Sequence, residues 1–275
     1  MNLKKYIKAI LIKNNIIRSR ILLENKILFN KNITTTVGTI RTINDQDDAW
    51  FCELSKHHNN IIDVGCNIGF MGIIAKLKHP DSKLIMIDPN PLALELAFKN
   101  MMKNKLTSNV NFINAFVGDK IGEDVKFYAL TTDQSGSMYK GSAQSAAMVN
   151  SFYFIQSTTI NQICEQNNFT PDFIKVDVEG AESLVLSGSS EIALKYKPIF
   201  LVEMHAPEEM PMHKNATLVL EWCKDLDYTP YYMTNHTILS NASEIAHRGK
   251  CHLLLIPKGT NYPIYLKKIS QGSLI

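Results

Sequence analysis

The chain has 275 residues, of which 45% are hydrophobic, so it can bury a full core in one large domain or in a domain with a small appendage. Its net charge is +3, but this charge is unevenly distributed along the chain. Residues 1–31 hold eight Lys and Arg against the single Glu24, so this segment carries +7 and the remainder −4. The main part of the chain therefore lacks the basic surface that nucleic-acid binding requires.

The basic segment alternates Ile and Leu with Lys and Arg at roughly helical spacing, which predicts an amphipathic helix. Its apolar runs are interrupted by Lys8, Lys13, Arg18 and Arg20. Each run is therefore too short to span a bilayer. The absence of a signal-type cleavage site favours a cytoplasmic protein. We expect residues 1–55 to form a basic, helical lead-in. It either packs on the main domain at 56–275 or makes peripheral membrane contact through residues 1–31.

Five cysteines are scattered along the chain without a Cys-x-x-Cys pair, which is typical of reduced thiols in the cytoplasm. Cys251 and His252 are adjacent, but one such pair cannot complete a tetrahedral zinc site. We therefore expect this pair to pack in the core.

From residue 59 onward, short apolar runs alternate with helical patterns, as in a parallel α/β sheet. Residues 124–159 break this rhythm: two β-ribbon segments flank a polar loop at 132–148, which is a candidate lid or acceptor site. The alternation then resumes. The expected strands are 59–65, 82–91, 109–119, 172–180, 197–205, 228–234 and 250–258, and the expected helices are 70–78, 91–104, 160–168, 181–188 and 216–226. The pattern predicts a doubly wound α/β sheet.

Ligands of such sheets bind beyond the carboxyl ends of the strands, so the residues there are the site candidates. The first strand ends in "DVGCNIGFMG", with Gly65, Gly69 and Gly72 in a turn suited to close ligand approach. Asn67 stands where a dinucleotide fingerprint has glycine, which argues against NAD. Asp63 lies within the strand, where its carboxylate can receive loop amides or meet a cationic ligand.

The second strand ends in Asp88, 19 residues after Gly69, where a carboxylate can accept hydrogen bonds from both hydroxyls of a ribose. Alternatively, Asp88 caps the helix that starts at Pro91. A ribose anchor with a glycine-rich loop, and without a phosphate cradle, describes a site for S-adenosylmethionine.

The motifs "IIDVGCNIGF", "MIDPNP", "INAFVGD", "DFIKVDVEGAE" and "PIFLVEMH" follow one another in an order and spacing that resembles the FkbM family of S-adenosylmethionine-dependent methyltransferases. The resemblance covers roughly residues 50 to 257. It implies a class I methyltransferase (Rossmann-like) fold: a mostly parallel, doubly wound sheet with one reversed strand, a β-ribbon insertion and the N-terminal lead-in. By position, the implied cofactor-binding residues are Asp63, Gly65, Asn67, Gly69, Asp88, Asn90, Val117 and Asp119.

Charged side chains cluster at the ends of two later strands. Lys175, Asp177 and Glu179 share one strand parity, and Glu203 and His205 alternate at the end of the following strand. We expect these five residues to be the catalytic group, with His205 or one of the carboxylates as the base for a hydroxyl acceptor.

Other interpretations of the same residues stay open. His205 could be a hydrogen-bonded core histidine, and Lys175 with Asp177 a buried ion pair. Glu182 would serve only the dipole of its helix. Asp177, Glu179 and Glu203 could hold a divalent cation, although we expect no metal.

The resemblance implies O-methylation of a hydroxyl on a sugar, a glycan or a secondary metabolite. The alternative is ribose 2'-O-methylation of nucleic acid, which the negative charge outside residues 1–31 disfavours. A scaffold without activity would not need the polar cluster. The expected partners are a small-molecule or glycan acceptor and no nucleic acid.

Overall fold

The computed structural model describes residues 22–40, 45–130, 136–270 and 272–273, together with Ile10 and Lys13. Most of the predicted basic helix in residues 1–31 lies outside these ranges, as does the start of the predicted lid, at 131–135. Within the described residues, none of the helices has the length and apolar character needed to span a membrane.

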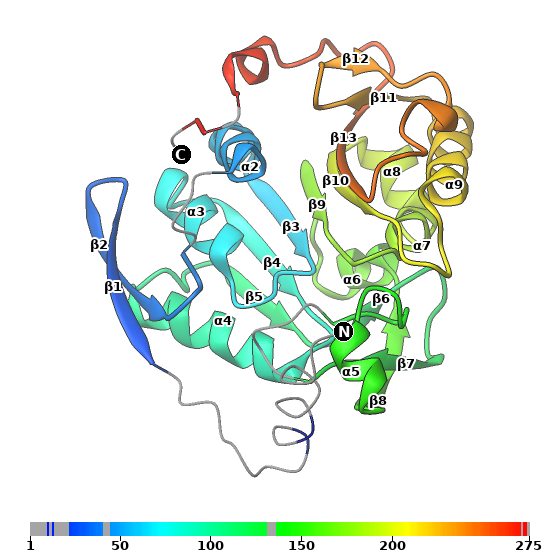
Figure 1. Ribbon diagram of the computed structural model, residues 1–275. Helices are drawn as coiled ribbons and strands as arrows, with labels where there is room; N and C mark the ends of the chain where they lie inside the picture. Colours follow the sequence, from blue (N-terminus) through cyan, green and yellow to red (C-terminus); the bar gives the residue numbers. More distant parts are fainter. Residues whose placement is uncertain are drawn as a thin grey trace.

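An eight-stranded sheet forms the centre of the molecule, with the strand order β12-β11-β13-β10-β9-β3-β4-β5 (Figure 1). Strands β3, β4, β5, β9 and β10 run parallel, and β13 runs antiparallel to both of its neighbours, β10 and β11. The strands are β3 (Asn60–Val64), β4 (Lys83–Ile87), β5 (Val110–Ile113), β9 (Phe173–Val176), β10 (Ile199–His205), β11 (Tyr228–Tyr232), β12 (Thr237–Ile238) and β13 (Lys250–Pro257). The predicted fold class is confirmed, with the short β12 as an addition at one edge.

Helices cover both faces of the sheet because its strands are apolar on both sides. Ile62 points into a core shared with α6, α7, α8 and α9, whereas its neighbour Ile61 points into a core shared with α2, α3 and α4. The helices are α2 (Gln46–Lys56), α3 (Phe70–Lys78), α4 (Pro91–Lys103), α6 (Ile160–Gln166), α7 (Glu182–Ser187), α8 (Ser190–Tyr196) and α9 (Met212–Asp225), with short 3-10 turns η1 (Ala242–Glu244) and η2 (Ile264–Lys268).

The insertion is a small sheet in the order β6-β8-β7, made of β6 (Phe116–Val117), β7 (Asp124–Tyr128) and β8 (Phe152–Thr158). The β-ribbon prediction is therefore confirmed. The predicted loop at 132–148 contains a short helix, α5 (Gln144–Met148), that the sequence pattern did not indicate.

The lead-in at 1–55 was predicted to be helical, and its described part corrects this. Residues 23–36 form a β-hairpin of β1 (Leu23–Leu28) and β2 (Lys31–Thr36), whereas α2 and the described Ile10 and Lys13 are helical, as expected. Asn100 and Asn104 of α4 accept hydrogen bonds from the backbone N–H groups of Thr36 and Thr34, at 2.9 Å each. These bonds fix the hairpin against the main domain.

Candidate active site

A pocket opens at the carboxyl ends of β3, β4 and β9. Its walls come from the loops after these strands and from the insertion, as expected for a doubly wound sheet. The residues around it are Val64, Gly65, Asn67, Ile87, Asp88, Pro89, Asn90, Ala93, Ala115, Phe116, Val117, Phe127, Gly136, Asp177, Val178 and Glu179. Five of the eight predicted cofactor residues line it: Gly65, Asn67, Asp88, Asn90 and Val117.

Asp88 lies at the centre of this pocket and is fixed by two backbone amides. One carboxylate oxygen accepts from the Asn67 N–H and the other from the Asn90 N–H, each at 2.8 Å. Burial raises the pKa of Asp88 to about 6, and these two hydrogen bonds limit the rise. The helix cap is Asn90, whose side chain accepts from two N–H groups of α4, so the capping alternative for Asp88 is wrong. Each oxygen of Asp88 keeps lone-pair capacity for a ribose hydroxyl.

We expect Asp88→Ala to weaken S-adenosylmethionine binding at least about tenfold, since the loss of a charge-assisted hydrogen bond costs about 1.5–3 kcal/mol. Isothermal titration calorimetry measures the Kd. Asp124→Ala, on exposed β7, removes a carboxylate outside the pocket and should leave the Kd unchanged. Equal binding by the Asp88 variant and wild type would contradict the placement of the cofactor.

Three predicted cofactor residues lie outside the pocket wall. Gly69 is the left-handed N-cap of α3, with φ +88°, and a Cβ there would lie 3.0 Å from Ala97, so this glycine serves helix packing. Asp119 borders a separate groove beside α6 and α8. Asp63 is fully buried, and its carboxylate lies 3.6 Å from the Lys175 Nζ. The expected cofactor contact of Asp63 is thus replaced by an internal ion pair.

Lys175 lies inside β9 between two carboxylates, with its Nζ 3.2 Å from Asp177 and 3.6 Å from Asp63. Burial alone would lower the pKa of Lys175, but the charges of Asp177 and Asp63 outweigh it and raise that pKa above its usual range. The ion-pair interpretation of Lys175 and Asp177 is therefore confirmed. Lys175 does not line the pocket, whereas Asp177 does.

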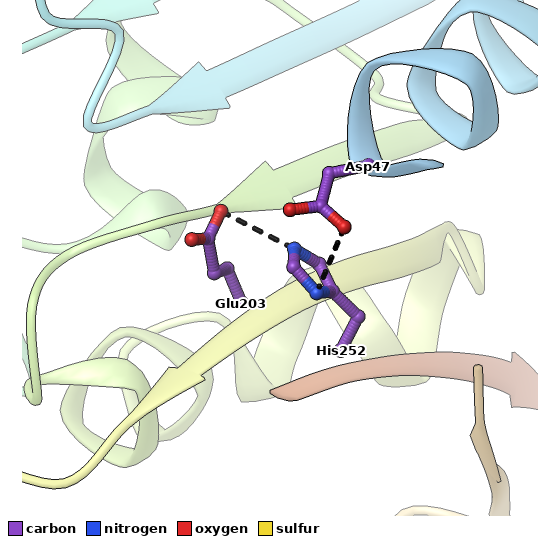
Figure 2. A group of neighbouring side chains, drawn as sticks. All are labelled: Asp47, Glu203 and His252. Carbon is purple, nitrogen blue, oxygen red and sulfur yellow. Dashed lines mark ion pairs between the residues drawn. The ribbon is translucent and has the colours of Figure 1, made fainter. Parts of the chain in front are cut away.

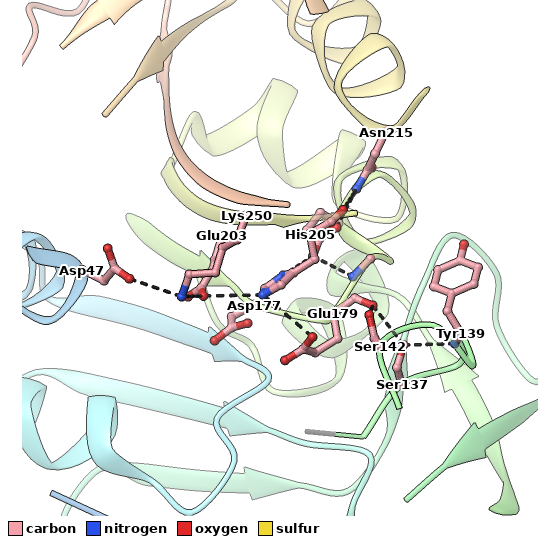
Figure 3. Close-up of polar contacts among 12 residues, drawn as sticks. Asp47, Ser137, Tyr139, Ser142, Asp177, Glu179, Glu203, His205, Asn215 and Lys250 are labelled. Carbon is pink, nitrogen blue, oxygen red and sulfur yellow. Dashed lines mark hydrogen bonds and ion pairs between the residues drawn. The ribbon is translucent and has the colours of Figure 1, made fainter. Parts of the chain in front are cut away.

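His205, at the end of β10, is surrounded by three carboxylates, of which those of Glu179 and Glu203 are labelled in Figure 3. Its Nδ1 lies 3.0 Å from Glu182, and its Nε2 lies 3.5 Å from Glu203 and 3.9 Å from Glu179. Burial alone would lower the pKa of His205, but the hydrogen bonds to Glu182 and Glu203 raise it to about 11. The surrounding carboxylates therefore favour the imidazolium, a hydrogen-bond donor, over the neutral ring that a base requires, and the predicted role of His205 as base stays a prediction.

Glu203 joins this group to a second one. Across the ladder of β10 and β13, Glu203 pairs with His252, and their side chains meet at 3.2 Å (Figure 2). The other ring nitrogen of His252 lies 3.4 Å from Asp47 in the first turn of α2. Hydrogen bonds from His205 and His252 outweigh burial and hold the pKa of Glu203 well below its usual range. His252 was expected to be ordinary core packing, and this contact corrects that expectation.

Two sets of side chains have ligand atoms within 4.8 Å of one another: Asp177 with Glu203 and His205, and Asp47 with Glu203 and His252. Lysine ammonium groups already lie against both sets. Lys175 pairs with Asp177, and Lys250 contacts Glu203 and lies 3.5 Å from Asp47. We therefore assign neither set as metal ligands.

Serine hydroxyl groups of the insertion form hydrogen bonds to the pocket wall. Ser137 and Ser142 both donate to the carbonyl oxygen of Glu179, at 2.9 and 3.0 Å. Glu209 accepts from the backbone N–H groups of Lys140 and Gly141. The described part of the predicted lid thus holds the backbone at Glu179, which lies in the left-handed region with φ +55°.

Sequence reasoning missed Asp47, Lys250 and His252, and it gave Glu182 only a dipole role. The first three come from α2 and β13, near opposite ends of the chain, so no local spacing relates them to His205. Alternation offered one usable signal: Lys250 and His252 have the same parity, as do Glu203 and His205 on the strand that pairs with theirs.

Comparison with known proteins agrees with this geometry. Residues 63–230 match the family model described as the methyltransferase FkbM domain. The chain is similar to methyltransferase sdnD of Sordaria araneosa, with 24% identity over 48% of this chain and 60% of that protein. A shorter match joins it to ribosomal RNA small subunit methyltransferase C of Mannheimia succiniciproducens, with 37% identity over 18% of this chain and 15% of that one. The chain thus spans 60% or less of these curated relatives.

Among solved structures, the chain resembles methyltransferase FkbM from Methylobacillus flagellatus KT, with 15% identity and a TM-score of 0.45. This match covers 72% of the chain and 43% of that structure. The family match includes Asp88 and the residues from Lys175 to His205, whereas Asp47, Lys250 and His252 lie outside it. Since the family model covers more than half of the sequence, the chain belongs to the FkbM family of methyltransferases, whose cofactor is S-adenosylmethionine.

Proposed function

We propose that this protein methylates a hydroxyl group of a sugar, a glycan or a secondary metabolite. The observation that carries the proposal is the junction between the pocket and the polar cluster. Asp177 and Glu179 line the pocket, and His205 lies 3.9 Å from Glu179. A hydroxyl acceptor needs both groups: a carboxylate that removes its proton and a donor that stabilises its oxygen.

The bound cofactor supplies an electrophilic methyl group on a positively charged sulfonium. The chain supplies complementary charge, because three carboxylates, those of Asp88, Asp177 and Glu179, line the pocket. Glu179 lines the pocket and lies 3.9 Å from His205 Nε2, so an acceptor hydroxyl beside this donor is also close to the Glu179 carboxylate, which we assign as proton acceptor. The loop after β9 and the serines of the insertion fix its backbone, which favours a constant alignment between acceptor and methyl group.

The decisive experiment incubates the full chain with methyl-labelled S-adenosylmethionine and a panel of sugars, glycans, hydroxylated metabolites and RNA. Label transferred to a hydroxyl of the first three classes supports the proposal. Label found only in RNA would support the ribose alternative, and label found only on nitrogen or carbon atoms would contradict O-methylation.

With an acceptor in hand, we expect His205→Gln to lower kcat about 100-fold, the usual loss when one positioned donor or acid–base group is removed. The Kd of S-adenosylmethionine should stay within about twofold, because His205 does not line the cofactor pocket. His213→Gln, on the exposed face of α9, is the matched control. Full turnover by the His205 variant would remove this residue from the catalytic group.

A further inference from the structure

Glu182 is an unusual first residue for a helix because its side chain is completely buried. A carboxylate in the first turn usually faces solvent, where the helix dipole stabilises it. Here the carboxylate is enclosed by donors from three segments. The Gly180 N–H donates to Oε1 at 2.9 Å, His205 Nδ1 lies 3.0 Å from the same oxygen, and Asn215 Nδ2 donates to Oε2 at 2.7 Å.

These contacts fix the orientation of the His205 ring. Its Nδ1 is committed to Glu182, so Nε2 is directed toward Glu179 and Glu203 at the mouth of the site (Figure 3). Asn215 adds a 3.4 Å contact to the His205 carbonyl oxygen, which ties the backbone of β10 to the same carboxylate. The ring can therefore present only Nε2 to an acceptor.

The charges around the ring favour its protonated form. Glu182 from α7, Glu203 from β10, and Glu179 and Asp177 from the loop after β9 are negative. Lys250 from β13 opposes them, and Tyr139 from the insertion lies near Glu182 as a neutral phenol whose pKa is raised by burial. Lys175 from β9 lies 3.2 Å from Asp177, so four carboxylates against two ammonium groups leave an excess of negative charge around His205.

We propose that Glu182 is a positioning residue that holds His205 as a fixed imidazolium, whose Nε2–H donates a hydrogen bond to the acceptor oxygen. Its contribution to catalysis rests on the proposed function. The acceptor proton passes to the Glu179 carboxylate, the new O–CH₃ bond forms, and the electron pair of the broken C–S bond stays on sulfur. His205 keeps both of its protons throughout, so the site selects acceptors whose oxygen can receive this donor.

The test needs no acceptor. Histidine labelled with ¹⁵N and ¹³C in the full chain reports the charge of each ring by NMR, and the spectrum of His205→Gln assigns the His205 signal. In the wild type, we expect this signal to keep its imidazolium shifts from pH 6 to above pH 9. In Glu182→Gln, we expect its titration midpoint to fall by about 1–3 pH units, the usual effect of a removed neighbouring charge.

Two variants separate this role from a merely structural one. Glu191→Gln, in the first turn of exposed α8, removes one charge from a helix start and should not shift the His205 midpoint. Glu182→Asp keeps the charge and should keep the imidazolium. If Glu182→Gln does not fold, the wild type and Glu182→Asp still decide the question.

A wild-type His205 that loses its charge below pH 7 would overturn the proposal, as would an unchanged midpoint in folded Glu182→Gln. If His205 stays an imidazolium but no hydroxyl acceptor is methylated, only the proposed function is contradicted. The inference that Glu182 stabilises the charged His205 would then still hold. The two failures are therefore distinguishable.

Discussion

Gly65→Ala should strongly weaken cofactor binding and lower the stability of the fold. A Cβ at this position would lie 1.8 Å from the backbone carbonyl oxygen of Asp177, and backbone atoms cannot rotate out of its way. The residue also has φ +82°, in the left-handed region that disfavours side chains. The loop after β3 would have to separate from the end of β9.

This separation would displace two walls of the pocket at once, because Gly65 and Asp177 both line it. We expect the free energy of unfolding to fall by about 3 kcal/mol, from overpacking and backbone strain together. The Kd of S-adenosylmethionine should rise at least about 100-fold, which corresponds to about 2.7 kcal/mol. Urea unfolding and calorimetry measure the two quantities.

Gly122 offers a matched control. It has φ +76°, yet a Cβ there would meet no atom within 4 Å. Gly122→Ala should therefore cost only the backbone strain, about 1 kcal/mol, and leave cofactor binding unchanged. If the two variants behaved alike, the close approach of the loop to Asp177 could not be the reason for glycine at position 65.

Lys175→Met should be the most destabilising change in the polar cluster. The substitution leaves the fully buried Asp63 without its cation, and removal of one member of a buried ion pair typically costs about 3–5 kcal/mol. Urea unfolding at neutral pH measures this loss. Lys120→Met, which breaks only the exposed pair with Glu123, should leave the free energy of unfolding close to that of the wild type.

The loss should depend on pH with a definite sign. Burial already raises the pKa of Asp63, and removing Lys175 raises it further. A carboxyl group with a raised pKa in the folded state contributes stability below its unfolded pKa, and that stability is lost as the pH rises through the folded value. The variant should therefore be closest to wild type near pH 4 and furthest from it at neutral pH.

A double variant distinguishes buried charge from lost packing. Asp63→Leu combined with Lys175→Met removes the fully buried carboxylate together with its cation and leaves only the partly exposed Asp177 without Lys175, so it should be more stable than Lys175→Met alone. A double variant as unstable as the single one would mean that packing, and not the orphaned carboxylate, sets the cost.

The sequence was most informative where local pattern and ligand chemistry coincide. Asp88 and Asn90 could be placed because a strand end and a proline-started helix define their neighbourhood, and both line the pocket. Asp63 was misplaced because strand parity says which face a side chain takes but not which partner it meets there. Glu182 was misjudged because burial of a helix start depends on α9 and β10, which approach it only in the folded chain.

The hairpin at 23–36 was predicted as a helix for a similar reason. Its alternating apolar and basic residues also fit helical spacing, and its turn lacks glycine: Phe29 and Asn30 adopt the left-handed conformation, with φ 52° and 59°. Nothing local marks this turn. The hydrogen bonds from Thr34 and Thr36 to the asparagines of α4 supply the missing information.

The position of β13 has a consequence for any attempt to shorten the protein. This strand lies between β10 and β11, although it follows both in the chain and falls outside the matched segment 63–230. A fragment cut to that segment would leave β10 with a bare edge, remove most of β3 and end inside β11, which would be detached from the sheet. It would also lose the buried Leu253, Leu254 and Leu255. The segment that matches the family model is therefore shorter than the part of the chain that forms the central sheet.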